Sequence, residues 1–183
     1  MRVTGSKFET REETGEMYIS GYFSVFNSDY EMWTGAKEQI ASTAFDDTIN
    51  DDIRCLTNHD TRLVLGRTKA GTLTLRIDNK GLWGEVRINQ NDRDAVNLYE
   101  RVKRGDVDQC SIGFEILEET FEDFGDYVRW TIVKVRLYEV SIVTFPAYED
   151  TSVTAREKDF KEMKKRKNEE WKAKMMKKVK GEL

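Results

Sequence analysis

The chain has 183 residues, of which 34 are acidic and 30 basic, and 38% belong to the hydrophobic set. It is too apolar for an intrinsically disordered protein, and no apolar run reaches the roughly 18–20 residues that a membrane-spanning helix needs. Two cysteines and one histidine exclude a disulfide framework and any site that needs two imidazoles. We expect a soluble protein of a reducing compartment, without secretory signal, metal or cofactor.

The charge is divided unevenly along the chain. Residues 156–183 hold 12 Lys/Arg against 6 Asp/Glu, a net charge of +6, whereas residues 1–155 hold 18 against 28, a net charge of −10. We predict a folded domain over residues 1–155 and a basic amphipathic helical tail over residues 156–183. Such a tail could be a solvated helix, or could contact an acidic partner, a nucleic acid or a membrane surface.

Two β-hairpins are predicted in the first half of the domain. Phe8–Arg11 and Met17–Phe26 are rich in β-branched and aromatic residues and flank a turn-like segment that ends in Gly15. Apolar and polar residues alternate over Leu73–Ile77, and after a glycine-containing turn the alternation resumes over Leu82–Ile88. A period of two residues that a short turn interrupts is typical of antiparallel strand pairs.

Two helices are predicted as well. Asn91 can cap a helix that Gly105 ends, because glycine commonly follows the last helical residue. The apolar face of this helix carries Ala95, Leu98, Tyr99 and Val102. A shorter helix is predicted over Ser42–Asn50.

The last third of the domain is rich in strands. Ile112–Ile116 shows the two-residue period, and Tyr127–Phe145 is long enough for two strands or one bent strand. Because strands outnumber helices, the expected fold class is mainly β with a few α-helices, arranged as a barrel or a sandwich that the helices flank.

Four side chains are candidates for chemistry. His59 is the leading general base, because histidine is largely neutral near neutral pH, although a lone histidine is more often structural. Ser111 lies where a loop enters a strand, and Gly113 beside it permits close approach of a substrate to main-chain N–H groups that could stabilise an oxyanion. Cys110 is a rival nucleophile, or a small buried thiol.

The fourth candidate, Glu139, falls on the more apolar face of its predicted strand, together with Leu137 and Ser141. An unpaired carboxylate would be costly there, so Glu139 needs a partner. A histidine would satisfy it. A salt bridge to an arginine, or a bulge that turns the side chain outward, is the structural alternative.

His59, Ser111 and Glu139 together offer a base, a nucleophile and an orienting carboxylate, and the chain order of such triads varies among folds. Asp60 is the rival third member, although neighbouring residues on a strand point to opposite faces.

Five blocks in the chain carry a family resemblance. They are Gly21–Phe26, Asn58-His59-Asp60 with Leu65-Gly66-Arg67, Lys80–Trp83, Gly105–Phe114 and Leu137–Ala147. In this order and at these spacings they resemble the prohead maturation protease family of tailed bacteriophages, and the resemblance runs from about Lys7 to Val153.

The resemblance implies a serine endopeptidase with a β-barrel similar to the herpesvirus capsid maturation protease. Such enzymes act inside the immature capsid, the prohead, in the host cytoplasm. They cleave scaffold or the scaffold-like segment of the major capsid protein, and often themselves. The resemblance implies His59 as base and Ser111 as nucleophile, and it implies no cofactor and no membrane or nucleic-acid partner. It allows a homo-oligomer.

The chain also departs from its relatives. The herpesvirus enzymes use a second histidine as third member, and this chain has none, so Glu139 is expected in its place. Tyr30–Ile40 is not the family's glycine- and acid-rich stretch, so the substrate cleft is expected to differ there. No arginine lies between Arg136 and Arg156, where the herpesvirus enzymes take oxyanion support, so the oxyanion donors stay open.

The alternative function is a non-catalytic capsid assembly or scaffold factor with the same fold, which would hold capsid protein through its basic tail. A complete His, Ser and Glu set argues against it. Nucleic-acid binding by the tail would show as a steep loss of affinity with salt, and the acidic domain makes it less attractive. We predict instead that residues 156–183 serve targeting or autoprocessing.

Overall fold

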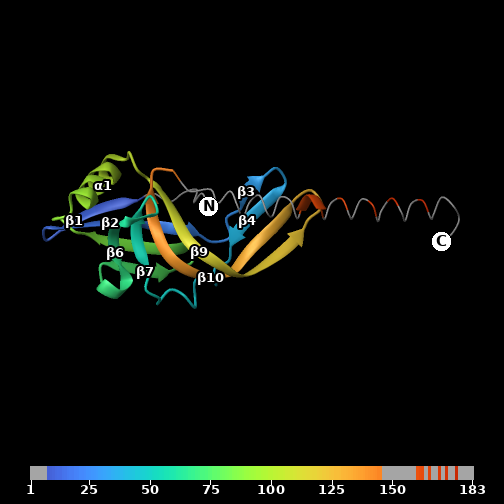
Figure 1. The fold of residues 1–183 in the computed structure, drawn as a ribbon, viewed down its shortest axis with the longest axis horizontal. Coiled ribbons are helices and arrows are strands. Elements are labelled where there is room, and N and C mark those ends of the chain that lie inside the picture. Colours follow the sequence, from blue (N-terminus) through green and yellow to red (C-terminus); the bar gives the residue numbers. More distant parts are fainter. Residues whose placement is uncertain are drawn as a thin grey trace. The chain divides into compact units, whose positions relative to one another are not determined.

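The structure is a computed structural model, and it describes residues 8–145, 160–162, 165, 169, 172 and 176. Contacts divide the chain into two compact units, Met1–Ala147 and Tyr148–Leu183. Within residues 8–145 the chain forms ten strands, one α-helix and a single 3-10 turn at Thr68–Ala70 (Figure 1). The prediction of a mainly β protein with few helices is therefore confirmed.

The first sheet contains both predicted hairpins. Its strand order is β1-β2-β8-β7, and all neighbours are antiparallel. A two-residue turn, Thr14-Gly15, joins β1 and β2, and both residues have positive φ, as the twist of a tight hairpin requires. The strands are β1 (Glu9–Glu13), β2 (Glu16–Val25), β7 (Leu73–Ile77) and β8 (Gly81–Ile88).

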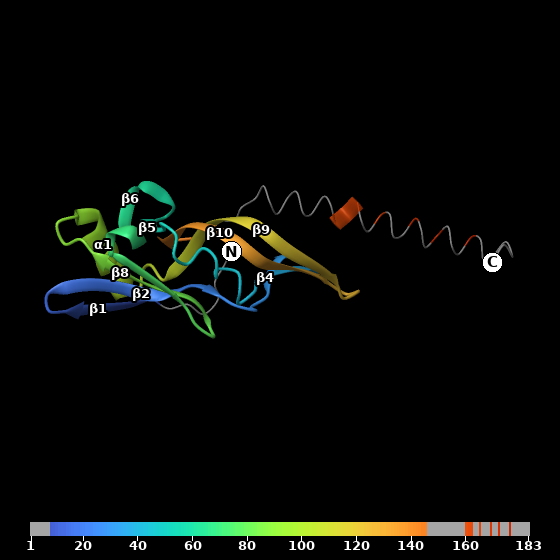
Figure 2. The same ribbon diagram turned by 90° about the horizontal axis from the view of Figure 1, so that it is seen from below.

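The second sheet is built around one long strand, β10 (Val128–Val143). Along one edge β10 pairs antiparallel with β9 (Gln109–Asp123), and along the other it pairs in parallel with β4 near its start and with β5 near its end. Figure 2 shows β9 and β10 running side by side. The remaining strands are β3 (Tyr30–Trp33), β4 (Ala36–Ile40), β5 (Arg54–Thr57) and β6 (Asp60–Arg67).

The long β-rich stretch predicted over residues 127–145 is thus one strand. Its pairing with β9 shifts register at three places, the last between Leu137 and Glu139. Such shifts let a strand bend and change the direction of its side chains, so that β10 can pair with β4 near its start and with β5 near its end.

One continuous apolar core joins the two sheets. It includes Phe23 and Val86 from the first sheet and Ile112, Val140 and Ile142 from the second. In residues 8–145 the strand orders form two open sheets, and no closed barrel is found. The predicted barrel is therefore not confirmed, and the two open sheets share one apolar core.

The helix α1 (Arg93–Arg104) buries the four apolar side chains predicted for its inner face. Its N-cap is Asp92 rather than Asn91: the Asp92 carboxylate accepts hydrogen bonds from the main-chain N–H groups of Asp94 and Ala95. Gly105 ends the helix with φ of 87°, as predicted.

The helix predicted over Ser42–Asn50 is wrong. This segment forms consecutive turns, in which most main-chain bonds join residues three apart, such as Ala44 N–H to Ala41 O. It instead supplies Phe45, which is fully buried, and Thr48, whose hydroxyl accepts a bond from the Leu137 N–H group. Tertiary contacts with β10 therefore override the weak local helix signal.

The hairpin β3–β4 was not predicted, and it occupies the segment in which the sequence departs from its relatives. Most of the predicted helical tail, residues 156–183, lies outside the described residues, and so does the predicted domain boundary after residue 155. None of the helices in the described part of the chain is long and apolar enough to span a membrane.

Candidate active site

His59 lies in a two-residue turn between β5 and β6. Thr57 pairs with Asp60 across this hairpin, and the turn residues Asn58 and His59 have φ of 51° and 59°. Asparagine and histidine are among the non-glycine residues that adopt this left-handed conformation most often, but only glycine adopts it without steric strain. Strain of this kind persists only where the surroundings hold it, and it is concentrated at functional sites.

Three hydrogen bonds hold this turn against the end of β10. The Asn58 N–H group donates to Ile142 O at 3.0 Å, and the Asn58 side-chain oxygen accepts from the Thr144 N–H group at 2.8 Å. The His59 N–H group donates to the Ser141 hydroxyl at 3.2 Å. Both turn residues are thus fixed to the strand that carries Glu139.

Glu139 binds the imidazole of His59. Its Oε1 atom lies 2.6 Å from His59 Nδ1, and its Oε2 atom accepts a 2.6 Å hydrogen bond from the Ser141 hydroxyl. An ionised carboxylate only accepts hydrogen bonds, so Nδ1 carries the proton and Nε2 of the neutral ring has the free lone pair. The predicted need of Glu139 for a partner is met by the histidine. Glu139 forms no ion pair with an arginine among the described residues, and the register shift beside it leaves its side chain directed at His59.

Ser111 lies on the same face of the sheet as this pair. In the β9–β10 ladder Ser141 lies opposite Ser111 and Glu139 opposite Gly113, and residues two apart on a strand share a face. A side chain at position 113 would clash with Glu139 Oε1 and would come 3.0 Å from its Cγ. The Glu139 side chain therefore crosses toward His59 through the space that glycine leaves open.

The predicted nucleophile and base are not hydrogen-bonded to each other. Ser111 is 3% exposed, and within the described residues no hydrogen bond joins it to His59. His59 Nε2 is buried and has no hydrogen-bond partner among these residues. Because Nε2 has no partner, it can accept a proton. The hydrogen bond between a nucleophile and its base often forms only when a substrate binds.

Comparison with known proteins gives one result. The profile of the caudovirus prohead serine protease family matches residues 6–166 of the 183. This chain belongs to that family. No curated protein and no solved structure matches it. Membership in this prohead protease family supports a serine peptidase in general.

The rival third member of this prohead protease, Asp60, is engaged elsewhere. Its carboxylate accepts hydrogen bonds from the Arg62 guanidinium at 2.7 and 3.0 Å, and these bonds hold the pKa of Asp60 at about 2. The carboxylate faces Arg62, and among the described residues only the Glu139 carboxylate is hydrogen-bonded to the His59 imidazole.

Both cysteines of the protease are buried thiols. Cys110 Sγ contacts the carbonyl oxygens of Tyr22 and Phe23 in the first sheet, so it points away from the face that carries Ser111. Burial, with the negative charge of Glu139 adding to it, raises the pKa of the Cys55 thiol. Neither sulfur is arranged as a nucleophile, because cysteines that are buried away from charged activating groups are unreactive.

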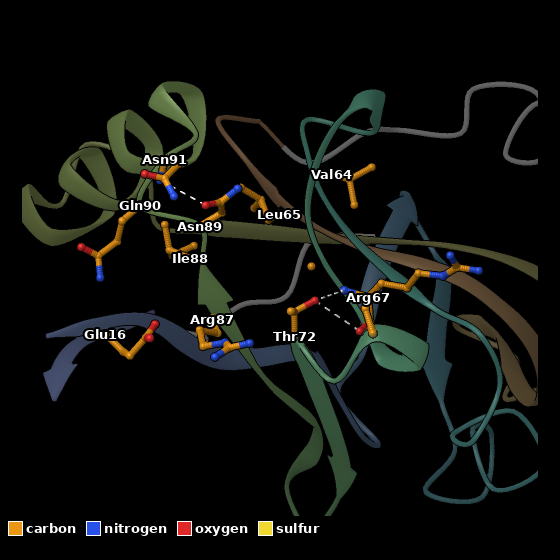
Figure 3. Close-up of a pocket in the computed structure, with 12 residues that line it drawn as sticks. Glu16, Val64, Leu65, Arg67, Thr72, Arg87, Ile88, Asn89, Gln90 and Asn91 are labelled. Carbon is orange, nitrogen blue, oxygen red and sulfur yellow. Dashed lines mark hydrogen bonds between the residues drawn. The ribbon is translucent and has the colours of Figure 1, made fainter. Parts of the chain in front are cut away.

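An open pocket of about 700 Å³ lies between β6 and β8 (Figure 3). Its wall includes Val64, Arg67, Thr72, Arg87 and Asn89. None of the three predicted site residues lines it. Arg67, one of the two arginines on this wall, is paired with Asp52. The described residues contain no cluster of three or more His, Cys, Asp or Glu side chains that could hold a metal.

Sequence reasoning missed the roles of Asn58, Gly113 and Ser141. A signal existed for Ser141, since it shares the predicted apolar face with Glu139 and a buried hydroxyl must find a partner. Asn58 offered a weaker one, because asparagine is favoured in two-residue hairpin turns. The role of Gly113 depends on the register between β9 and β10, which the sequence does not reveal.

Proposed function

We propose that this chain is a serine endopeptidase of prohead maturation, with Ser111 as nucleophile, His59 as general base and Glu139 as orienting carboxylate. The observation that carries the proposal is the 2.6 Å contact between Glu139 Oε1 and His59 Nδ1, on the sheet face that also bears Ser111. Membership in the prohead serine protease family supplies the reaction class.

In the first half of the reaction, His59 Nε2 takes the proton of the Ser111 hydroxyl while the oxygen attacks the scissile carbonyl carbon. The resulting imidazolium is stabilised by Glu139, which accepts the hydrogen bond from Nδ1. His59 then gives its proton to the leaving amine, and an acyl-enzyme on Ser111 remains. A water molecule, deprotonated by His59, hydrolyses that ester and frees the serine.

Strand geometry assigns Glu139 a further task. A neutral histidine can carry its proton on either nitrogen, and only the form with the proton on Nδ1 can act as base at Nε2. A carboxylate at Nδ1 selects this form. Loss of such a partner in serine proteases leaves the geometry intact but the wrong tautomer populated.

The proposed substrates are the major capsid protein or its scaffold, and the chain itself. We propose that the enzyme acts inside the immature capsid in the host cytoplasm, as the family description suggests. A fold similar to the herpesvirus capsid protease, main-chain oxyanion donors near Gly113, and a targeting or autoprocessing role for residues 156–183 stay predictions.

The test is mass spectrometry of proheads assembled with wild type, Ser111→Ala or Cys110→Ala. Cleavage of capsid or scaffold protein is expected with wild type and Cys110→Ala, and none with Ser111→Ala. Cleavage by Ser111→Ala at the wild-type rate would overturn the nucleophile. Intact proteins in wild-type particles would instead favour a non-catalytic assembly factor.

A further inference from the structure

Ser141 is a fully buried polar side chain. It lies in β10 between β5 and β9, is 0% exposed, and has the core residues Val140 and Ile142 as chain neighbours. A hydroxyl transferred from water into such a position is destabilising unless hydrogen bonds replace those it loses. Its retention at this place therefore calls for a physical account.

The hydroxyl uses both of its bonding modes on the candidate site. Its proton is donated to Glu139 Oε2 at 2.6 Å, and its oxygen accepts from the main-chain N–H group of His59 at 3.2 Å. One side chain thus joins the carboxylate of the proposed triad to the backbone of its base.

Ser24 shows that the fold does not impose such bonding on every buried serine. It is also 0% exposed and lies in β2, but its hydroxyl has no hydrogen-bond partner in the described part of the chain. The difference between the two serines lies in their neighbours: Ser141 lies two residues after Glu139 on the same face, and opposite Ser111.

Each bond of Ser141 removes a freedom that would misalign the site. With Oε2 held, the carboxylate cannot rotate about its Cγ–Cδ bond, so Oε1 stays directed at His59 Nδ1. With its N–H group held, His59 keeps the left-handed conformation that its φ of 59° records. The Glu139 carboxylate fills the space that a side chain at position 113 would take, so no side chain at that position restrains it.

We propose that Ser141 is a positioning residue that fixes the Glu139–His59 pair and thereby sets the tautomer of the base. The proposal rests on the proposed function, in which His59 acts through Nε2. Ser141 takes no part in the bond changes, because its hydroxyl proton is already committed to Glu139.

The lone histidine of the chain makes a direct test possible. In full-length protein labelled with nitrogen-15 histidine, every imidazole signal belongs to His59, so its tautomer can be measured by NMR without assignment. Wild type is expected to carry the proton on Nδ1 in the neutral form. Ser141→Ala should give a mixture of the two tautomers, whereas Ser141→Thr, which keeps the hydroxyl, should restore the wild-type signal.

Kinetics on a capsid-protein peptide supply the second readout. Ser141→Ala is expected to lower kcat by about 10- to 100-fold, the loss typical of a misplaced catalytic group, with KM changed less than about twofold. Ser24→Ala is the matched control, since it removes an equally buried hydroxyl elsewhere, and it should leave both the tautomer and kcat unchanged.

Ser141→Ala with the wild-type tautomer and kcat would overturn the proposal. Should the alanine variant fail to fold, Ser141→Cys decides, because sulfur of similar shape is a weak donor and should shift the tautomer in the same direction. Absence of cleavage by wild type would refute the proposed function instead, while the tautomer measurement, which needs no turnover, would still show whether Ser141 holds the pair.

Discussion

The two halves of strand β9 both pair with β10, but they differ in how deeply they are buried. Residues 109–114 of β9, the inner segment, are buried or half-buried, and β9 contacts the first sheet through β2. Residues 117–123, the outer segment, are exposed throughout and include two large apolar side chains, Leu117 and Phe121. The candidate nucleophile lies in the inner segment only.

The difference shows that a polar group at a buried position needs a hydrogen-bond partner within the protein. In the inner segment and the part of β10 opposite it, Ser141 and Glu139 bind each other or His59, and position 113 must be glycine to make room. In the outer segment, acidic side chains such as Glu122 are exposed, so water can replace any hydrogen bond that they make. The site could therefore form only where burial makes each bond necessary.

The largest expected effect tests the carboxylate of the inner region. Glu139→Gln should lower kcat by about 10⁴-fold, because an amide no longer selects the histidine tautomer that acts as base. Glu122→Gln, the same change at an exposed position of the outer segment, should leave kcat unchanged. Rates of peptide cleavage measure both, and equal rates for the two variants would contradict the assignment of Glu139.

Asp60→Asn extends this comparison to the rival carboxylate. Its partner Arg62 holds the pKa of Asp60 at about 2, below the ordinary value, so the stabilising contribution of the charged form is complete above about pH 4 and is lost as the pH falls toward 2. At neutral pH we expect nearly wild-type cleavage. A loss as large as that of Glu139→Gln would transfer the orienting role to Asp60.

The next effect concerns stability. Ile142→Ala, at a fully buried position of β10 opposite the inner segment, should lower the free energy of unfolding by about 2–5 kcal/mol, because it leaves a cavity in the shared core. Phe121→Ala removes a ring of the outer segment that is 41% exposed and whose centroid lies 4.9 Å from the ring centroid of Trp130. This change should lower the free energy of unfolding by about 1 kcal/mol. Urea unfolding of both variants measures the contrast, and similar losses would show that the outer segment is as tightly packed as the inner one.

The smallest expected change in stability accompanies a clear loss of activity. The methyl group of Gly113→Ala would displace the carboxylate of Glu139, so kcat should fall about 100-fold while the free energy of unfolding changes by about 1 kcal/mol. Thr120→Ala in the outer segment is the control for both quantities. A wild-type kcat in Gly113→Ala would mean that catalysis does not depend on the position of the Glu139 carboxylate beside Gly113.

Local sequence signals were sufficient for much of the fold. The hairpins around Gly15 and Gly81 and the face of α1 follow from periodicities that neighbouring residues alone create. The same reasoning located Glu139 on a face with Ser141, because residues two apart on a strand point the same way. It failed for Ser42–Asn50, where contacts with β10 outweigh propensity.

The sequence by itself determined which side chains could carry chemistry and that Glu139 required a partner. Only the tertiary structure decided that His59 is this partner, that Asp60 turns to Arg62, and that Ser141 holds the pair. Asp60 and Arg62 lie two positions apart on one strand, but the contacts of His59 with Glu139 and Ser141 join residues about 80 positions apart. They depend on the parallel pairing of β5 with β10 and on the register of β9, and strand register is set by the packing of the whole core rather than by any local pattern.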